Sequence, residues 1–313
     1  MSVAVVVVHW GDKSDTLACL ASVARSTVSA VPLVVVDNGT GAPADAEVTA
    51  AAPGAGLIRL PENRGFAGGA NVGIRHALAA GARWVVLLNN DAVVEPGALA
   101  ALVEVAERAE RVGAVGAKVL SAADPKRLWG AWGRVTYMAA LVEIVGAGEL
   151  DGPAYGDVRE VEWVPGCAML LARPALEAVG LLDERFFAYH EDVDWCSAAR
   201  ARGFRILFAP AARVLHRGGG SLAAYGVASP VRYLSARNTM LYARKHARPG
   251  DWLRLAVTIG GSLPLEWLRR RRDGEAAAVR LLLRGYLDGL LARDVPQAEL
   301  GLTSPRRTEG ERL

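Results

Sequence analysis

The 313-residue sequence has few cysteines and little net charge. Its three cysteines, Cys19, Cys167 and Cys196, are an odd number without a C-x-x-C pair, which indicates neither a disulfide framework nor a zinc site and fits a reducing compartment. A formal charge of +3 gives little long-range attraction for phosphate backbones, so we expect no nucleic-acid partner. With 52% hydrophobic residues, the chain has the composition of a globular protein with a large core.

The sequence also lacks a long uninterrupted apolar run. A membrane-spanning helix needs roughly 20 such residues, and the nearest segment, residues 252–268, contains Arg254, Pro264 and Glu266. The first residues, MSVAVVVVHW, have no basic region before the apolar stretch, which indicates a first strand rather than a signal peptide. We therefore expect a cytoplasmic protein that does not cross the membrane.

Four short and mostly β-branched apolar runs predict strands that are buried on both faces: residues 3–8, 33–36, 57–60 and 84–88. Helical patterns lie between them. Ser14 or Asp15 caps the first helix, residues 70–80 form the second, and Pro96 opens a third that continues through Glu110. This alternation predicts an α/β fold with parallel strands and crossover helices.

After residue 118 the alternation gives way to segments that contain glycine and tryptophan. We therefore divide residues 1–225 into a first half (1–118) and a second half (119–225). Within the second half we expect strands near 134–138 and 161–171, helices over 174–179 and 192–201, and extended segments at 204–208 and 213–215. A C-terminal helical region (226–295) and a flexible polar tail (296–313) complete the prediction.

Two carboxylates follow predicted strands directly. Asp37 ends VVVDNG, and Asp91 ends VVLLNND. Ligands of open α/β sheets bind at the carboxyl ends of the strands, so both side chains are expected to face one crevice. The alternative is turn chemistry, since Asp-Asn-Gly is a good turn sequence and Asp91 is equally suited to a cap or a turn.

ENRGFAGGANVGI, which begins at Glu62, joins a strand end to a helix through several glycines. Glycines permit close approach of the backbone to a ligand, and a helix start offers N–H donors to an anion. The spacing is not G-x-G-x-x-G, so the dinucleotide fingerprint is absent. A tight loop without a ligand is the alternative.

FFAYHEDVDWC places Glu191, Asp192 and Asp194 in the first turn of a predicted helix. The aromatic residues before them form an apolar surface that raises a carboxyl pKa, which favours Asp192 as a general base with Glu191 as its neighbour. Acidic residues also stabilise a helix N-terminus through the helix dipole, and that structural role stays open.

His216, in RVLHRGGGS, ends another extended run. An isolated histidine is more often structural than a ligand. A divalent cation held by Asp91 would nevertheless accept an imidazole nitrogen as a further ligand.

Together these stretches resemble the inverting family 2 glycosyltransferases of the GT-A fold, in particular their rhamnosyltransferase-like branch. The stretches that match, in the family's order, are VVVDNG, LPENRGFAGGANVGI, VVLLNNDAVVEPGAL, WVPGCAMLLARPALEAVGLLDERFFAYHEDVDWC, FAPAARVLHRGGGS and SARNTMLYARKHARP. They extend to about residue 248. The resemblance implies a Rossmann-like GT-A catalytic domain with a mostly parallel central sheet over residues 1–225, followed by a C-terminal helical extension. Within that domain it implies that residues 1–118 are the nucleotide-binding half and residues 119–225 the acceptor-side half.

The resemblance also implies a function. The enzyme would move a sugar, with rhamnose favoured, from a dTDP or UDP donor to a hydroxyl of a glycan or lipid-linked acceptor in bacterial cell-envelope polysaccharide synthesis. Asp192 would be the base, beside Glu191, and Asp91 and His216 would hold Mn²⁺ or Mg²⁺. The donor would be contacted by Asp37, Asn63, Arg64, Asn90 and Arg237, and the acceptor side would include Trp163 and Gly166.

The chain departs from the family pattern at three positions. Asn89 stands where many relatives carry a first aspartate, Ala198 stands where this branch usually has arginine, and Gly11 replaces an asparagine. Alternatives are a transferase for another sugar, such as galactofuranose or N-acetylglucosamine, and a degenerate scaffold that binds sugar nucleotides without catalysis. A nucleotidyltransferase would need a basic glycine-rich loop after the first strand, and HWGDKSD matches that poorly.

The C-terminal region carries a basic run, Arg269 to Arg272, beside its longest apolar segment. This pairing suits a helix that contacts the inner face of the cell membrane peripherally. The alternative is an amphipathic helix that packs on the catalytic domain or on a second subunit in a homodimer.

Overall fold

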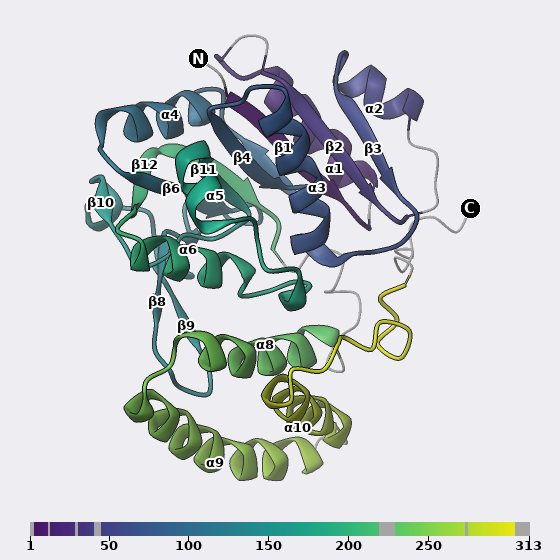
Figure 1. Cartoon of the computed structure of the whole chain (residues 1–313), viewed down its shortest axis with the longest axis vertical. Helices are drawn as coiled ribbons and strands as arrows, with labels where there is room; N and C mark the ends of the chain where they lie inside the picture. Colours follow the sequence, from purple (N-terminus) through teal and green to yellow (C-terminus); the bar gives the residue numbers. More distant parts are fainter. Residues whose placement is uncertain are drawn as a thin grey trace.

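The computed structural model describes residues 3–11, 13–28, 31–40, 45–218, 229–272 and 275–303. These residues form a ten-stranded sheet with helices on both faces, and a layer of C-terminal helices at one end of the molecule (Figure 1). The predicted α/β class with a helical extension is therefore confirmed.

The first half of the sheet is parallel. The four predicted strands are β1 (Val3–His9), β2 (Leu33–Asn38), β3 (Gly56–Leu60) and β4 (Trp84–Asn89), in the order β4-β1-β2-β3. The crossovers contain α1 (Lys13–Ala24), α2 (Asp45–Ala51), which was not predicted, and α3 (Gly65–Ala79). Because the strand order reverses at β1, the right-handed crossovers place α1 and α3 on opposite faces.

Helix α3 begins before the predicted residue 70 because its glycines are helical residues that allow close packing. A Cβ on Gly73 would lie 2.2 Å from Cγ1 of Val6. Glycine at this position therefore lets the helix backbone lie directly on β1, and it positions the segment that leads into α3 at the edge of the sheet.

The second half of the sheet is mixed. It contains β5 (Ala92–Val94), β6 (Val112–Ser121), β7 (Leu128–Gly130), β10 (Arg159–Glu160), β11 (Ala168–Ala172) and β12 (Arg205–His216), with α4 (Ala98–Arg108) between β5 and β6. Strand β11 pairs antiparallel with both β4 and β6, and β12 runs parallel to β6. Strand β6 crosses the predicted boundary at residue 118, so the two halves share one sheet.

Two strand predictions in this half were wrong in detail. Residues 161–167 are not a strand, and only the end of the predicted run forms β11. The two extended segments at 204–215 are a single strand, β12, whose register on β6 shifts between Ala209 and Arg213. The proline between them accounts for the break, because it lacks an N–H for the sheet.

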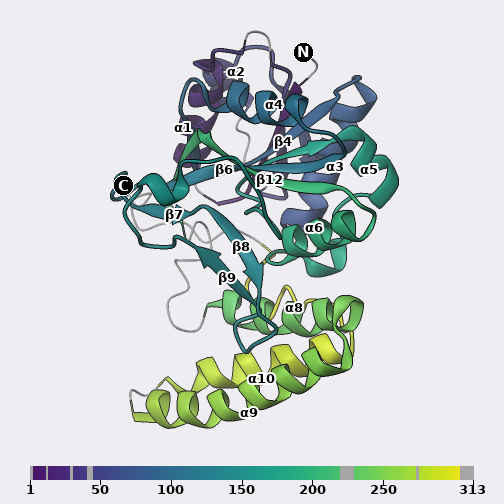
Figure 2. The same ribbon diagram turned by 90° about the vertical axis from the view of Figure 1, so that its left-hand side faces the viewer.

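Several smaller elements complete this half of the chain. Strands β8 (Trp132–Val135) and β9 (Val142–Val145) form a separate hairpin that extends toward the C-terminal helices (Figure 2). The predicted helix at 174–179 is α5 (Arg173–Val179), and that at 192–201 is α6 (Glu191–Ala201). Two short 3-10 helices, η1 (Pro153–Tyr155) and η2 (Glu184–Phe186), complete this part.

The C-terminal region consists of α8 (Pro230–His246), α9 (Pro249–Arg272) and α10 (Ala276–Leu290). Helix α8 lies between the catalytic domain and the other two helices (Figures 1 and 2). A Cβ on Gly289 would lie 2.0 Å from the carbonyl oxygen of Arg237, so glycine lets α10 pack directly on the backbone of α8. Of the helices described, none combines the length and the apolar character that crossing a bilayer requires.

The predicted flexible tail is wrong for residues 296–303. These residues form hydrogen-bonded turns, and Leu300 and Leu302 are buried at 8% and 1% exposure. Residues 304–313 lie outside the described part of the chain. The prediction of a flexible tail rested on the polar composition of residues 296–313 as a whole. Leu300 and Leu302 nevertheless pack in a hydrophobic cluster with Phe187 of the catalytic domain.

Candidate active site

A cavity of about 420 Å³ opens at the carboxyl edge of the parallel strands. Elements far apart in the sequence line it, from the end of β1 to Leu302. Of the side chains predicted from the sequence, the structure brings the following to this cavity: Asn63, Asn90, Asp91, Trp163, Gly166, Glu191, Asp192 and His216. Asp37, Arg64 and Arg237 are not part of its lining.

Asp37 closes a turn at the end of β2. Its Oδ1 accepts hydrogen bonds from Thr40 N at 3.0 Å and from Thr40 Oγ1 at 2.7 Å. Oδ1 of this carboxylate therefore makes the turn contacts of the alternative reading, and the next residue, Asn38, lines the cavity.

Asn38 holds the loop before α3. Its Nδ2 donates to Asn63 Oδ1 at 2.9 Å and to the carbonyl of Gly65 at 3.0 Å, while its Oδ1 accepts from Arg64 N. Asn63 Oδ1 also accepts from Gly65 N at 2.8 Å. The Arg64 side chain forms a salt bridge with Glu184 at 2.6 Å, which holds its guanidinium away from the cavity lining.

Asp91 and His216 meet because β5 pairs with β12, which sets His216 opposite Ala92. Nε2 of His216 lies 3.0 Å from Oδ1 of Asp91, and the two side chains are only 5% and 6% exposed. Nδ2 of Asn89 lies 3.4 Å from the same nitrogen, and Trp129 contacts the imidazole edge-on with ring centroids 4.8 Å apart.

The Asp91–His216 pair fits a divalent cation. Two ligands at about 2.1 Å from an octahedral metal, at a right angle, lie about 3 Å apart, which is the separation of this oxygen and nitrogen. Across the described ranges no group of three or more His, Cys, Asp or Glu side chains could hold a metal. The protein thus offers one carboxylate and one imidazole, an arrangement that leaves the other coordination positions to non-protein ligands.

Glu191 and Asp192 begin α6 at the cavity wall. Oδ2 of Asp192 accepts from Gly166 N at 2.7 Å, and its Oδ1 accepts from Val193 N at 2.8 Å. Oε2 of Glu191 is buried without a hydrogen-bond partner. Burial raises the pKa of both carboxyl groups, and the charges of Asp192 and then Asp194 raise the pKa of Glu191 further. A carboxylate with a raised pKa is suited to accept a proton near neutral pH.

The loop before this pair is strained. Phe187, Tyr189 and His190 are non-glycine residues with φ angles of 63°, 70° and 67°, and each such residue costs on the order of 1–3 kcal/mol. Nδ2 of Asn238 on α8 lies 2.7 to 2.9 Å from the carbonyl oxygens of Phe186, Ala188 and Tyr189 and holds the loop in place. Burial lowers the pKa of His190, which also lines the cavity, to about 4.

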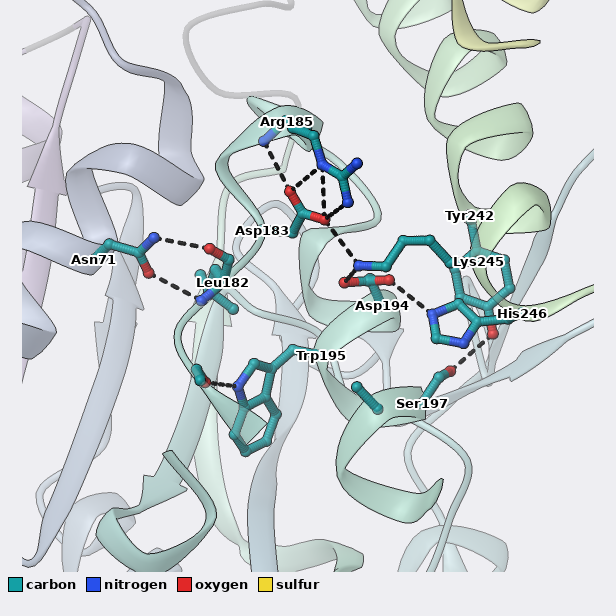
Figure 3. Close-up of polar contacts among 12 residues, drawn as sticks. Asn71, Leu182, Asp183, Arg185, Asp194, Trp195, Ser197, Tyr242, Lys245 and His246 are labelled. Carbon is teal, nitrogen blue, oxygen red and sulfur yellow. Dashed lines mark hydrogen bonds and ion pairs between the residues drawn. The ribbon is translucent and has the colours of Figure 1, made fainter. Parts of the chain in front are cut away.

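Helix α8 also holds α6 itself (Figure 3). Asp194 accepts from Lys245 Nζ at 2.6 Å, and His246 Nε2 lies 2.7 Å from its other oxygen. Lys245 also binds Asp183 at 2.8 Å, just before η2. On the opposite side, Asn71 of α3 pairs with both backbone groups of Leu182. The acidic pair is therefore positioned from two sides.

Arg237 requires a correction. The side chain is 2% exposed, and its guanidinium donates four hydrogen bonds: two to the carbonyl of Arg293, one to the carbonyl of Arg185 and one to Oδ1 of Asn238. These partners occupy the groups that were predicted to hold a donor diphosphate. Arg237 instead joins α8 to the segment that follows α10.

Sequence analysis missed four residues that shape the site: Asn38, Asn238, Lys245 and His246. Asn238, Lys245 and His246 are spaced seven and eight residues apart, which places them on one face of α8. That spacing was a usable signal within SARNTMLYARKH. The contribution of Leu302 had no signal in the sequence, because its segment reads as a polar tail.

Comparison with known protein families agrees with this fold. The family model described as "Glycosyltransferase like family 2" matches residues 1–250. The chain belongs to glycosyltransferase family 2. As a glycosyltransferase of this family it is similar to the N-acetylglucosaminyl-diphospho-decaprenol L-rhamnosyltransferase of Mycobacterium tuberculosis, with 29% identity over 279 residues that cover 79% of this chain and 85% of the relative. It is also 31% identical over 230 residues to the O-antigen biosynthesis protein RfbC of Myxococcus xanthus, which covers 68% of this chain and 16% of that protein.

Solved structures give the same fold at low identity. The mannosyltransferase PcManGT from Pyrobaculum calidifontis, in complex with GDP-Man and Mn²⁺, aligns with a TM-score of 0.56 and 16% identity over 92% of this glycosyltransferase and 87% of that chain. GalNAc-T7 with UDP, GalNAc and Mn²⁺ aligns with a TM-score of 0.61 and 14% identity over 78% of this chain and 48% of that one. These likenesses establish the GT-A fold.

Glu191→Gln is expected to stabilise the protein at neutral and alkaline pH. Because the folded pKa of Glu191 is raised, its stabilising contribution is complete below the unfolded pKa and is lost as pH rises through the folded pKa. Glutamine carries no charge and has no such loss. In urea denaturation, the advantage of the variant over the wild type should grow from about pH 4 to about pH 8. Glu107→Gln on the exposed face of α4 is the control, and a variant that is no more stable than the wild type at the upper pH contradicts the assignment.

Proposed function

We propose that this glycosyltransferase is metal-dependent and inverting, and that it moves a sugar from a nucleotide diphosphate to a hydroxyl of a glycan or lipid-linked acceptor. One observation carries the proposal: the Asp91–His216 pair and the Asp192 carboxylate line the same cavity. The pair suits a cation beside a diphosphate, and the carboxylate suits a base beside a hydroxyl. Cys167 lines the same cavity, and burial, followed by the charges of Asp91 and Asp192, raises the pKa of its thiol.

On the donor side, Asp91 and His216 would hold Mn²⁺ or Mg²⁺, with Asn63 and Asn90 at the donor nucleotide. The structural neighbours named above contain Mn²⁺ with UDP or GDP-Man, which supports this choice of cation and donor class. When bound, the cation offsets the negative charge that grows on the diphosphate as the bond to the sugar breaks. Nδ2 of Asn90 donates to Thr16 Oγ1 at 3.1 Å, which fixes its side chain beside Asp91.

On the acceptor side, Asp192 removes the proton of the attacking hydroxyl. The hydroxyl oxygen bonds to the anomeric carbon as the bond to the diphosphate breaks, so a single in-line displacement inverts the anomeric centre. The N–H of Gly166 keeps Oδ2 of Asp192 in place, and a Cβ at Gly166 would lie 3.3 Å from that oxygen. Trp163 gives this side of the cavity an apolar wall.

The sugar that the resemblance favours is rhamnose, from a dTDP or UDP donor. The name of the Mycobacterium tuberculosis relative supports rhamnose and a prenyl-linked acceptor, and that of the Myxococcus xanthus relative, an O-antigen biosynthesis protein, supports the proposed role in cell-envelope polysaccharide synthesis. A thermal-shift panel of dTDP-rhamnose and the UDP and GDP sugars, each with Mn²⁺, tests the donor. Stabilisation by a UDP sugar alone would favour galactofuranose or N-acetylglucosamine, and binding without turnover would favour a scaffold.

Asp192→Asn is expected to lower kcat by about 10²–10⁴-fold, the usual contribution of a general base. Donor binding should survive, because the amide keeps the shape of the side chain. Transfer is measured by release of the nucleoside diphosphate, and the anomeric configuration of the product by NMR. Asp157→Asn, on the exposed surface far from the cavity, is the matched control. A fully active Asp192→Asn enzyme, or a product with retained configuration, would contradict the mechanism.

Asp91→Ala is expected to abolish the part of donor binding that depends on the metal. Calorimetric titrations with the nucleoside diphosphate, with and without Mn²⁺, separate this part from contacts made by the nucleoside. Wild-type affinity should fall when the metal is removed with EDTA, and the variant should show the lower affinity in both conditions. Equal dependence on Mn²⁺ in the variant and the wild type would place the cation elsewhere.

We also propose that α9 and α10 contact an anionic membrane surface. The exposed large apolar residues of the two helices are Leu253, Val257, Leu265, Trp267, Leu268, Leu283, Leu287 and Leu290, and Leu291 follows directly after α10. The guanidinium of Arg271 lies 5.0 Å from the ring centroid of Trp267, and the Arg269 side chain is 72% exposed. An apolar helix face flanked by arginine and tryptophan suits the lipid headgroup region, and the two helices form the end of the molecule opposite the sheet (Figure 2).

Flotation with vesicles that contain phosphatidylglycerol tests this face. The wild type should float, and Leu265→Glu combined with Trp267→Glu should not, because burial of two charges among acyl chains is unfavourable. Leu150→Glu, on an exposed leucine of the catalytic domain, is the control. If the wild type does not float and the double variant instead converts a dimer to a monomer in gel filtration, the face binds a second subunit.

A further inference from the structure

The residues after α10 return to the catalytic domain as a compact turn. This C-terminal turn, residues 296–303, is closed by hydrogen bonds from Leu300 N to Pro296 O, Gly301 N to Ala298 O and Leu302 N to Gln297 O, at 2.8 to 3.2 Å. Gly301 has a φ of 66°, which suits glycine at the end of a turn. The geometry is that of a defined element rather than an extended tail.

The C-terminal turn contacts the loop that precedes α3. The carbonyl oxygen of Leu302 accepts a hydrogen bond from Asn63 Nδ2 at 2.7 Å, across 239 positions in the sequence. The other end of the Asn63 amide is bound by Asn38 and Gly65. The turn therefore completes the set of partners that orients a side chain of the cavity wall.

The same turn contacts the loop that carries the proposed base. Leu300 and Leu302 form one hydrophobic cluster with Phe187, Tyr233 and Leu234, and Trp10 packs against it. Phe187 also accepts a backbone hydrogen bond from Ala67 N at 3.0 Å. The turn thus lies where the segment before α3, the loop before α6 and α8 meet.

Specific contacts hold the C-terminal turn against the catalytic domain and α10. The guanidinium of Arg237 holds the carbonyl of Arg293, three residues before the turn begins. Within the turn, Glu299 forms a salt bridge with Arg284 of α10 at 2.6 Å. These contacts hold both the residues that lead into the turn and the turn itself. Leu302 is 1% exposed and belongs to the lining of the cavity.

We infer that the C-terminal turn supports one wall of the donor-nucleoside subsite, in which the buried side chain of Leu302 packs behind the wall and its carbonyl positions Asn63 toward the nucleoside. The inference rests on the proposed function, because Asn63 and the end of β2 lie on the side of the cavity assigned to the donor. The side chain of Leu302 is buried in the hydrophobic cluster, and its carbonyl accepts the hydrogen bond that orients Asn63. Positioning of this kind raises the affinity for the donor.

Two truncations of the full chain test the inference. A chain that ends after Thr303 keeps the turn, and a chain that ends after Asp294 lacks it. Calorimetric titration with dTDP, UDP and GDP in the presence of Mn²⁺ should give full-length affinity for the first chain. The second should bind the preferred nucleotide about tenfold more weakly, comparable to the loss of one buried leucine. In turnover, KM for the donor should rise by a similar factor.

A pair of point variants keeps the test decisive if the shorter chain does not fold. Leu302→Ser should weaken nucleotide binding, and Leu302→Met, which preserves apolar volume, should restore it. Equal affinity in all variants overturns the inference, and so does tighter binding after removal of the turn, which would mean that the turn occludes the subsite. If the full chain binds none of the three nucleotides with Mn²⁺, the proposed function fails and the inference fails with it.

Discussion

The site depends on how α8 holds a strained loop. Three residues before α6 have left-handed backbone conformations that turn the chain so that Glu191 and Asp192 face the cavity. Such conformations persist only when the surroundings determine them. The amide of Asn238 binds the loop carbonyls, and Lys245 and His246 bind Asp194 one helical turn into α6. Helix α8 therefore fixes the direction of the acidic pair together with the N–H of Gly166.

The two carboxylates that line the cavity, Asp91 and Asp192, have different surroundings. Asp192 accepts hydrogen bonds from two backbone N–H groups, which lower its pKa, but burial raises the pKa by more. A raised pKa suits a group that takes up a proton. Asp91 is paired with His216 in a geometry that suits a cation. One fold thus places a candidate base and a candidate cation ligand in a single space of about 420 Å³.

The C-terminal region is part of the catalytic arrangement and not an appendage to it. Helix α8 anchors the base loop, α10 packs closely on α8 through Gly289, and the C-terminal turn returns to Asn63. The outer faces of α9 and α10 carry exposed leucines and arginines and lie at the end of the molecule opposite the sheet.

Local sequence determined much of this protein. The β-branched runs 3–8, 33–36, 57–60 and 84–88 specify buried strands whichever partners they find, and ordered motifs such as LLNND and YHEDVDW carry the family resemblance. Polar residues that follow strands directly must lie at the edge of the sheet, so Asp91 and Asn90 reached the cavity as expected. The start of α6 at Glu191 was likewise predicted from the local sequence.

Only the tertiary structure decided which of these polar groups are still available to a ligand. Arg237 has the right chemistry for donor binding, yet the carbonyls of Arg185 and Arg293 occupy its guanidinium. A hydrogen-bonding group binds whichever partner the fold brings nearest, and sequence spacing does not show a partner 52 or 56 positions away. For the same reason, the place of Leu302 in the cavity wall depended on helices that carry residues 296–303 back across the molecule, and no local pattern of apolar or polar residues records that path.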